Sequence, residues 1–259
     1  MLGAMEYALA ADDLARIDGL LQRLDPRVKI VGLFSLIIAA SLSRKLEIIG
    51  GIFLVALGLA ILSRIPLLIL AKRGWITALL FTGFIAAPSI FITPGNIIYR
   101  LPLLGWTVTA QGLTSATFLI GRVETSVTLS LLLVLCTPWT TVLKALRVLC
   151  VPAVFIVILG MTYRYIFLLL QKSREMLEAR QSRMVGELDS RQSRRLAVAG
   201  IVVLLGKTFE LSSEVYLAML SRGFRGDVDT LDEFSMTGRD WVGILVLPGL
   251  AALAIYFGR

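Results

Sequence analysis

Long apolar runs, separated by short segments that carry most of the basic residues, dominate this 259-residue sequence. Hydrophobic residues make up 57% of the chain, against about 45–50% in a soluble globular domain. Apolar runs of this kind are typical of helices that cross a lipid bilayer. The pattern therefore predicts an all-α polytopic membrane protein, with about five transmembrane helices and two further long helices.

Residue types that are rare or absent exclude several classes of function. The chain has no histidine and only two cysteines, so we expect no resident metal site, no histidine-based catalysis and no cofactor bound by this chain. The net charge is +8, but the basic residues lie between apolar runs and form no tail. This distribution fits membrane topology better than nucleic-acid binding. We expect neither an enzyme nor a nucleic-acid-binding protein.

The N-terminal segment, residues 1–27, is predicted to be amphipathic and cytoplasmic, with a surface helix over residues 11–24. Asp25-Pro26 should end that helix and start the next, because proline disfavours helix at the preceding residue and suits a first turn. The apolar runs 30–42 and 48–62 are each short for a full span. They are predicted to form a helical hairpin.

The third and fourth spans are predicted over residues 75–92 and 113–135, which completes a transmembrane region over residues 28–138. Residues 93–112 hold one arginine and no acid, which suits the outer side. The fourth span contains Arg122 and Glu124. Charges are costly in lipid, so these two should face a protein partner, a cavity or the outer interface.

A short motif, A-x-x-S-R, occurs at residues 179–183 and again at 218–222, 39 residues later. Steps of three and four residues back from each arginine follow a largely apolar stripe, which places each arginine at the end of an amphipathic helix. Two such helices could insert paired arginines into a partner. The alternative is that both arginines simply face water or lipid head groups.

The distribution of charge predicts a cytoplasmic coupling region over residues 139–228. Residues 139–149 and 172–196 are both rich in basic residues, so both look cytoplasmic. We therefore expect one long helix over about 153–186 and a second over about 194–222, capped by Gly223, both lying along or obliquely in the inner leaflet. Residues 229–259 should contain an acidic loop and a last span over 241–257, with the N-terminus cytoplasmic and the C-terminus outside.

One segment has only part of the pattern of a nucleotide-binding loop. Gly206-Lys207-Thr208 lacks the earlier glycine and the strand that a phosphate-binding loop needs. Lys207 and Glu210 instead indicate a charge-compensated face of a helix.

The combination of motifs resembles the transmembrane T component of energy-coupling factor (ECF) transporters, most closely the cobalt/nickel type called CbiQ. The resemblance covers about residues 18–228 in order. It rests on Leu24-Asp25-Pro26-Arg27-Val28-Lys29, Thr137-Pro138, Val151-Pro152, Tyr163-Arg164-Tyr165-Ile166 and the two Ser-Arg motifs. It implies long coupling helices arranged as a cross, each carrying a small-Arg-small triplet that inserts into one of two ABC-type ATPase subunits.

Carried onto this chain, the resemblance implies that the triplets are Ser182-Arg183-Met184 and Ser221-Arg222-Gly223. Serine replaces the family's alanine in both, and methionine replaces glycine in the first. Arg180, in the overlapping Ala179-Arg180-Gln181 one turn earlier on the same face, is a further candidate for the role of Arg183. The helix faces that would support a separate substrate-binding membrane subunit carry Leu159, Thr162, Ile166, Leu204, Leu211 and Val215.

The resemblance thus implies a coupling subunit in the cell membrane that transmits ATPase motions during uptake of cobalt or nickel ions. ATP and Mg²⁺ would be bound by the ATPase partners. Two alternatives remain open at this point: a T component of a vitamin-type ECF transporter, and a non-transporting membrane scaffold that docks a soluble partner.

Overall fold

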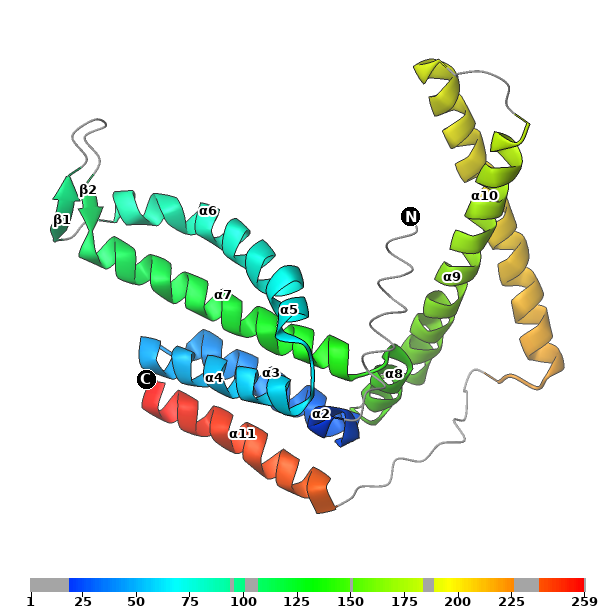
Figure 1. The fold of residues 1–259 in the computed structure, drawn as a ribbon. Helices are drawn as coiled ribbons and strands as arrows, with labels where there is room; N and C mark the ends of the chain where they lie inside the picture. Colours follow the sequence, from blue (N-terminus) through cyan, green and yellow to red (C-terminus); the bar gives the residue numbers. More distant parts are fainter. Residues whose placement is uncertain are drawn as a thin grey trace. The chain divides into compact units, whose positions relative to one another are not determined.

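The computed structural model describes residues 19–93, 96–100, 107–149, 151–183, 189–225 and 238–258 (Figure 1). The predicted surface helix over residues 11–24 therefore lies largely outside the described residues, as do Met184 and most of the acidic loop. The chain divides into two compact units, one formed by residues 1–145 with 234–259 and the other by residues 146–233. Each unit is described by itself.

The first unit is a bundle of apolar helices, which confirms the predicted fold class. Its described elements are α2 (Leu20–Arg23), α3 (Pro26–Leu42), α4 (Leu46–Leu62), α5 (Leu67–Leu70), η1 (Ala71–Trp75), α6 (Ile76–Ile92), β1 (Ile97–Arg100), β2 (Thr107–Thr109), α7 (Ala110–Cys136) and α11 (Gly238–Gly258). Helix α8 (Trp139–Val148) crosses the boundary between the units. The predicted helices over 30–42, 48–62, 75–92, 113–135 and 241–257 are all present.

The bundle is held together by close packing of small and branched side chains. Helix α11 packs mainly against α3, and α7 packs against α3, α4 and α6. The core contains Leu33, Leu36, Leu129 and Leu132, all almost fully buried. At Gly32 a Cβ atom would lie 2.5 Å from the Leu247 Cδ1 of α11, so only glycine lets these two helices approach so closely. Small residues serve helix packing in membranes in the same way.

Local sequence signals explain where α3 begins. Asp25 is the N-cap, and its carboxylate accepts a hydrogen bond of 2.9 Å from the backbone N–H of Arg27. Pro26 is the first helical residue, where its missing N–H costs nothing. The predicted break at Asp25-Pro26 is confirmed.

The connection between α4 and α6 contains two features that the sequence did not indicate. Helix α4 ends in a Schellman motif, in which the Arg64 N–H donates to the Ile61 carbonyl and the Ile65 N–H to the Ala60 carbonyl. Arg64 has a φ of 54°, a left-handed conformation that glycine usually occupies. A π-helical turn, η1, then leads into α6, and the Trp75 Nε1–H donates to the Thr128 Oγ1 of α7 at 2.9 Å.

The loop predicted for the outer side holds a short antiparallel hairpin. Strands β1 and β2 pair with Tyr99 opposite Val108 and Arg100 opposite Thr107. The hairpin joins the end of α6 to the start of α7, which begins at the N-cap Thr109.

The second unit consists chiefly of two long helices, α9 (Ala153–Gln181) and α10 (Ser190–Ser221). Helix α9 ends about five residues before its predicted end, because Ser182 and Arg183 form a turn. Helix α10 begins four residues before its predicted start. By length and composition, four helices among the described residues could cross a membrane, namely α7, α9, α10 and α11, and α4 and α6 are shorter apolar helices. Length and composition thus do not separate α9 and α10 from spans, and their in-plane arrangement stays a prediction.

Candidate coupling site

The two A-x-x-S-R motifs form the same local structure at the two helix ends. In the first, residues 179–183, the Ser182 hydroxyl donates to the Ala179 carbonyl at 3.0 Å. In the second, residues 218–222, the Ser221 hydroxyl donates to the Ala218 carbonyl at 2.9 Å. We call these segments the first and second serine–arginine corners. Each serine is thereby held against its own helix in the same way.

The backbone of the two corners also matches. The Arg183 N–H donates to the Arg180 carbonyl at 3.0 Å, and the Arg222 N–H donates to the Met219 carbonyl at 3.1 Å. Both arginine side chains are exposed. The repeated motif therefore presents an exposed arginine in the first turn beyond the helix in both cases, as a docking element requires.

The second corner ends in the glycine cap that the sequence predicted. Gly223 has a φ of 81°, its N–H donates to the Leu220 carbonyl, and the Phe224 N–H donates to the Met219 carbonyl. These two bonds form a Schellman motif, which favours glycine at its left-handed position. The residue at the corresponding position of the first corner, Met184, lies outside the described residues.

The side chain of Arg180 lies between the helices α9 and α10. Its Nη1 donates to the Leu196 carbonyl of α10 at 2.7 Å. A Cβ atom on Gly200 would lie 3.2 Å from that nitrogen and 3.2 Å from Met176 Cε, so Gly200 allows the close approach. Gly200 is the one buried residue among the described part of α10, and α9 has none. The Arg180 side chain thus lies at the close contact between the two helices, which Figure 1 draws crossing each other.

The crossing places the two corners far apart. Arg183 follows Arg180 by three residues and so lies close to the crossing. Arg222 lies 26 residues beyond Leu196, which at about 1.5 Å per residue is roughly 39 Å along α10. A separation of this size suits two docking sites on two different protein subunits better than one shared site.

On the side of the crossing that holds the start of α9 and the end of α10, the two helices enclose an apolar groove of about 610 Å³. Its walls include Thr162 and Ile166 from α9 and Leu211 and Val215 from α10. These are four of the six residues predicted to contact a substrate-binding subunit, and the structure brings them together on one groove. The other two, Leu159 and Leu204, do not line it. Leu159 is exposed and Leu204 is half-buried.

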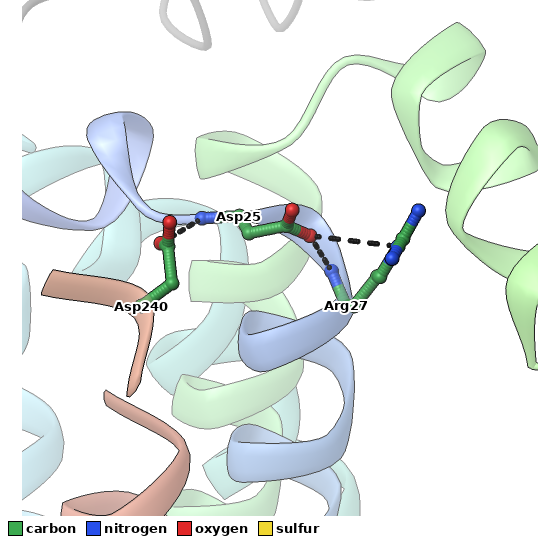
Figure 2. Close-up of polar contacts among 3 residues, drawn as sticks. All are labelled: Asp25, Arg27 and Asp240. Carbon is green, nitrogen blue, oxygen red and sulfur yellow. Dashed lines mark hydrogen bonds and ion pairs between the residues drawn. The ribbon is translucent and has the colours of Figure 1, made fainter. Parts of the chain in front are cut away.

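A buried polar contact that the sequence did not indicate joins the start of α3 to the start of α11. The Asp240 carboxylate, in the first turn of α11, accepts a hydrogen bond of 2.7 Å from the backbone N–H of Asp25 (Figure 2). Asp25 Oδ1 also lies 4.0 Å from Arg27 Nε. Asp25 and Asp240 are 7% and 3% exposed. The only sequence signal was an acid at the start of an apolar run, where it also suits a helix N-terminus.

Lys29 completes the polar end of the bundle. Its ammonium group donates to the carbonyls of Gln22 and Cys136, each at 3.3 Å. Cys136 is the last residue of α7, so the lysine cation lies where the carbonyls of a helix end lack partners. The start of α3, Asp25 to Lys29, therefore ties together α2, α7 and α11.

The two charges predicted within the fourth span differ in their surroundings. Arg122 Nη2 donates a hydrogen bond of 2.7 Å to the backbone carbonyl of Ser43, which is the C-cap of α3. The arginine therefore has a hydrogen-bond acceptor within this chain. Both carboxylate oxygens of Glu124 are buried without a hydrogen-bond partner among the described residues. Of the three surroundings expected for these two charges, a protein partner, a cavity or the outer interface, Arg122 thus has a protein contact, which lies within this chain.

One charged pair that the sequence predicted lies on α10. Lys207 Nζ lies 3.2 Å from the Glu210 carboxylate, which confirms the predicted charge-compensated helix face. Within the described part of the chain, no three acidic, cysteine or histidine residues are grouped so as to hold a metal ion.

Comparison with known proteins identifies the family. The family model of CbiQ, described as cobalt transport protein, matches residues 19–231, from the start of α2 to beyond the second corner. The chain belongs to this family. An uncharacterized protein of Methanocaldococcus jannaschii is 35% identical over 249 residues, which cover 94% of this chain and 85% of that protein.

Two further relatives are named energy-coupling factor transporter transmembrane protein EcfT. The protein of Lacticaseibacillus paracasei is 29% identical over 91% of this chain and 94% of its own length. The protein of Brevibacillus brevis is 29% identical over 87% of this chain and 89% of its own length. Together with the apolar helices of the fold, the family places this chain in the cell membrane as a multi-pass protein.

Proposed function

We propose that this chain is the T component of an ECF transporter and that its two serine–arginine corners dock two ABC-type ATPase subunits. The matching hydrogen bonds of the corners, Ser182 to Ala179 and Ser221 to Ala218, carry the proposal. The family match and the two relatives named EcfT support the role of T component. The ATPase partners would bind ATP and Mg²⁺, and a separate membrane subunit would bind the substrate.

The proposed chemistry of docking follows from the guanidinium group. It is always charged and can form two parallel hydrogen bonds with one carboxylate, which a lysine cannot reproduce. Truncation of one side chain in a buried charged pair of this kind weakens the free energy of binding by about 2–5 kcal/mol. A small neighbour, Ser182 or Ser221, leaves room for the walls of the partner's groove.

The proposed mechanism uses the crossing of α9 and α10. When the ATPase subunits close on ATP, the distance between the two corners changes, and the helices rotate about the contact of Arg180 with Leu196. The groove lined by Ile166, Leu211 and Val215 changes shape with that rotation. A substrate-binding subunit seated on these apolar side chains would tilt in response.

The proposed cargo is cobalt or nickel ion, supported by the family's description as cobalt transport protein. The relatives named EcfT carry no cargo in their names, and a vitamin-type transporter is the alternative. In either case the cargo would be bound by the separate membrane subunit. The identity of that subunit decides between the two.

Affinity purification of the chain from its native membrane, followed by mass spectrometry, tests the proposal. The variants are Arg183→Ala/Arg222→Ala and, as control, Arg194→Ala, an exposed arginine whose Nε donates to the Ser190 carbonyl of its own helix. We expect two ABC-type ATPase chains and a small membrane subunit with the wild type and the control, and loss of the ATPases from the double variant. Absence of ATPases from every sample would favour the scaffold alternative.

A further inference from the structure

The bundle contains a second groove, which the proposed coupling does not use. It has a volume of about 610 Å³ and lies between α2, the end of α4 and the start of α11. Its apolar walls include Leu20, Leu62, Val242 and Val246. These four side chains are also exposed on the surface of the bundle, so the groove opens onto the apolar face that lipid would cover.

Three arginines line the same groove. Arg23 is the last residue of α2, Arg64 follows the end of α4, and Arg239 lies in the first turn of α11. None of the described residues that line the groove is acidic. Basic residues at the ends of apolar helices mark the cytoplasmic side of a membrane. The groove therefore combines a cationic rim with apolar walls at the depth of the lipid head groups.

The backbone of Arg64 has a left-handed conformation that is unusual for a residue with a side chain. Its φ of 54° is one that glycine adopts without strain, and the corresponding cap of α10 does carry glycine, Gly223. A strained non-glycine residue in such a position suggests a function for the side chain. Arg64 is one of the three arginines that line this groove.

Three hydrogen bonds fix the walls of the groove. The Leu21 N–H donates to Ser63 Oγ and the Gln22 side-chain amide to the Ser63 carbonyl, which holds α2 on the end of α4. The contact of Asp240 with Asp25 holds the start of α11 on α3 (Figure 2). The three arginines are therefore carried by elements that the bundle itself keeps in place.

We infer that this groove binds an anionic phospholipid of the cytoplasmic leaflet, with its phosphate between Arg64 and Arg239 and its acyl chains along Leu62, Val242 and Val246. An arginine fork matches phosphate geometry. The positive charge of the arginines favours binding of a lipid with net negative charge over binding of a zwitterionic lipid. The proposal is independent of ATPase docking, since none of the corner residues lines the groove.

Native mass spectrometry of the purified full chain, titrated with phosphatidylglycerol or phosphatidylcholine, tests the inference. We expect preferential retention of phosphatidylglycerol, reduced about fivefold for each arginine removed in Arg64→Gly and Arg239→Gln. Arg64→Gly relieves the backbone strain, so its loss of lipid cannot be attributed to misfolding. The matched control is Arg44→Gln, an exposed arginine in the α3–α4 connection that does not line the groove. Retention unchanged in Arg64→Gly/Arg239→Gln, or equal retention of both lipids, would overturn the inference.

A photo-activated cross-linking residue in place of Leu62 identifies the occupant directly in membranes. Cross-linking to phospholipid supports the inference. Cross-linking to peptide, whether from residues 1–18 of the chain or from another protein, would assign the groove to that segment and overturn it.

Discussion

The bundle and the α9–α10 pair differ in what their helices pack against. The bundle buries leucines, alanines and a set of polar groups that are satisfied inside it, such as Lys29 on the Gln22 and Cys136 carbonyls. In contrast, α9 has no buried residue, and α10 buries only Gly200 among its described residues. One region supplies its own core, and the other leaves its apolar side chains for lipid or for partners.

This difference separates the region that determines folding stability, the bundle, from the region whose geometry would transmit motion, the α9–α10 pair. Packing of the bundle is complete enough that substitutions there should act on folding. The helix pair is joined at one crossing by Arg180 and Gly200, so substitutions there should act on the geometry of the pair. Two helices with one close crossing and few buried contacts can change their angle at little cost, as a coupling device requires.

The largest effect on stability is expected in the bundle, at the contact of α3 with α11. Gly32→Ala places a Cβ atom 2.5 Å from Leu247 Cδ1 and 2.7 Å from Leu247 Cβ, so the helices must separate. Overpacking of this kind lowers the free energy of unfolding by about 1–3 kcal/mol. Thermal unfolding of the purified protein in detergent measures the loss.

Gly50→Ala is the matched control, because a Cβ atom at Gly50 of α4 meets nothing within 4 Å. At such an open helix position alanine stabilises by about 0.5–1 kcal/mol relative to glycine. The two substitutions should therefore shift the unfolding temperature in opposite directions. Equal shifts would contradict the close packing of α3 and α11.

An effect of similar size is expected from the buried link between α3 and α11. Asp240→Ala leaves the buried N–H of Asp25 without its acceptor, which costs about 1–3 kcal/mol. Asp240→Asn keeps an oxygen acceptor and should recover much of the loss. Urea or thermal unfolding compares the two, and equal stability of Asp240→Ala and the wild type would refute the structural role of the link.

The smallest effect on stability, but a distinct effect on geometry, is expected at the helix crossing. Arg180→Ala removes one exposed hydrogen bond, worth about 0.5–1.5 kcal/mol, and leaves the core of the bundle untouched. Spin labels at Lys172 and Lys207 in the complete complex should then give a broader distribution of distances. Arg194→Ala should leave the distribution as in the wild type. An unchanged distribution in Arg180→Ala would show that Arg180 does not fix the crossing.

Local signals in the sequence predicted the features that depend on local physics. The periodicity of apolar residues predicted the helices. Asp25-Pro26 predicted the start of α3, and Gly223 predicted the cap at the end of α10. The serine–arginine corners were also recognised from sequence, because a motif that closes two amphipathic stripes fixes its own position at a helix end.

Features that depend on distant residues could not be predicted in this way. Asp25 and Asp240 are 215 residues apart in the chain, and nothing local to either residue indicates the other. Arg180 was grouped with Arg183 by its spacing, yet its side chain contacts Leu196 of the other helix. The left-handed Arg64 lacks the glycine that would have marked such a turn, and no local pattern indicated the π-turn before α6.

ATP-driven uptake by the reconstituted transporter tests the central claim most directly, with Arg183→Glu/Arg222→Glu compared with the wild type. Reversal of both charges replaces attraction by repulsion at each docking site, while the bundle that anchors the chain in the membrane is unaltered. The account predicts that uptake is abolished although the variant reaches the membrane in normal amounts. Full uptake by this variant would contradict it.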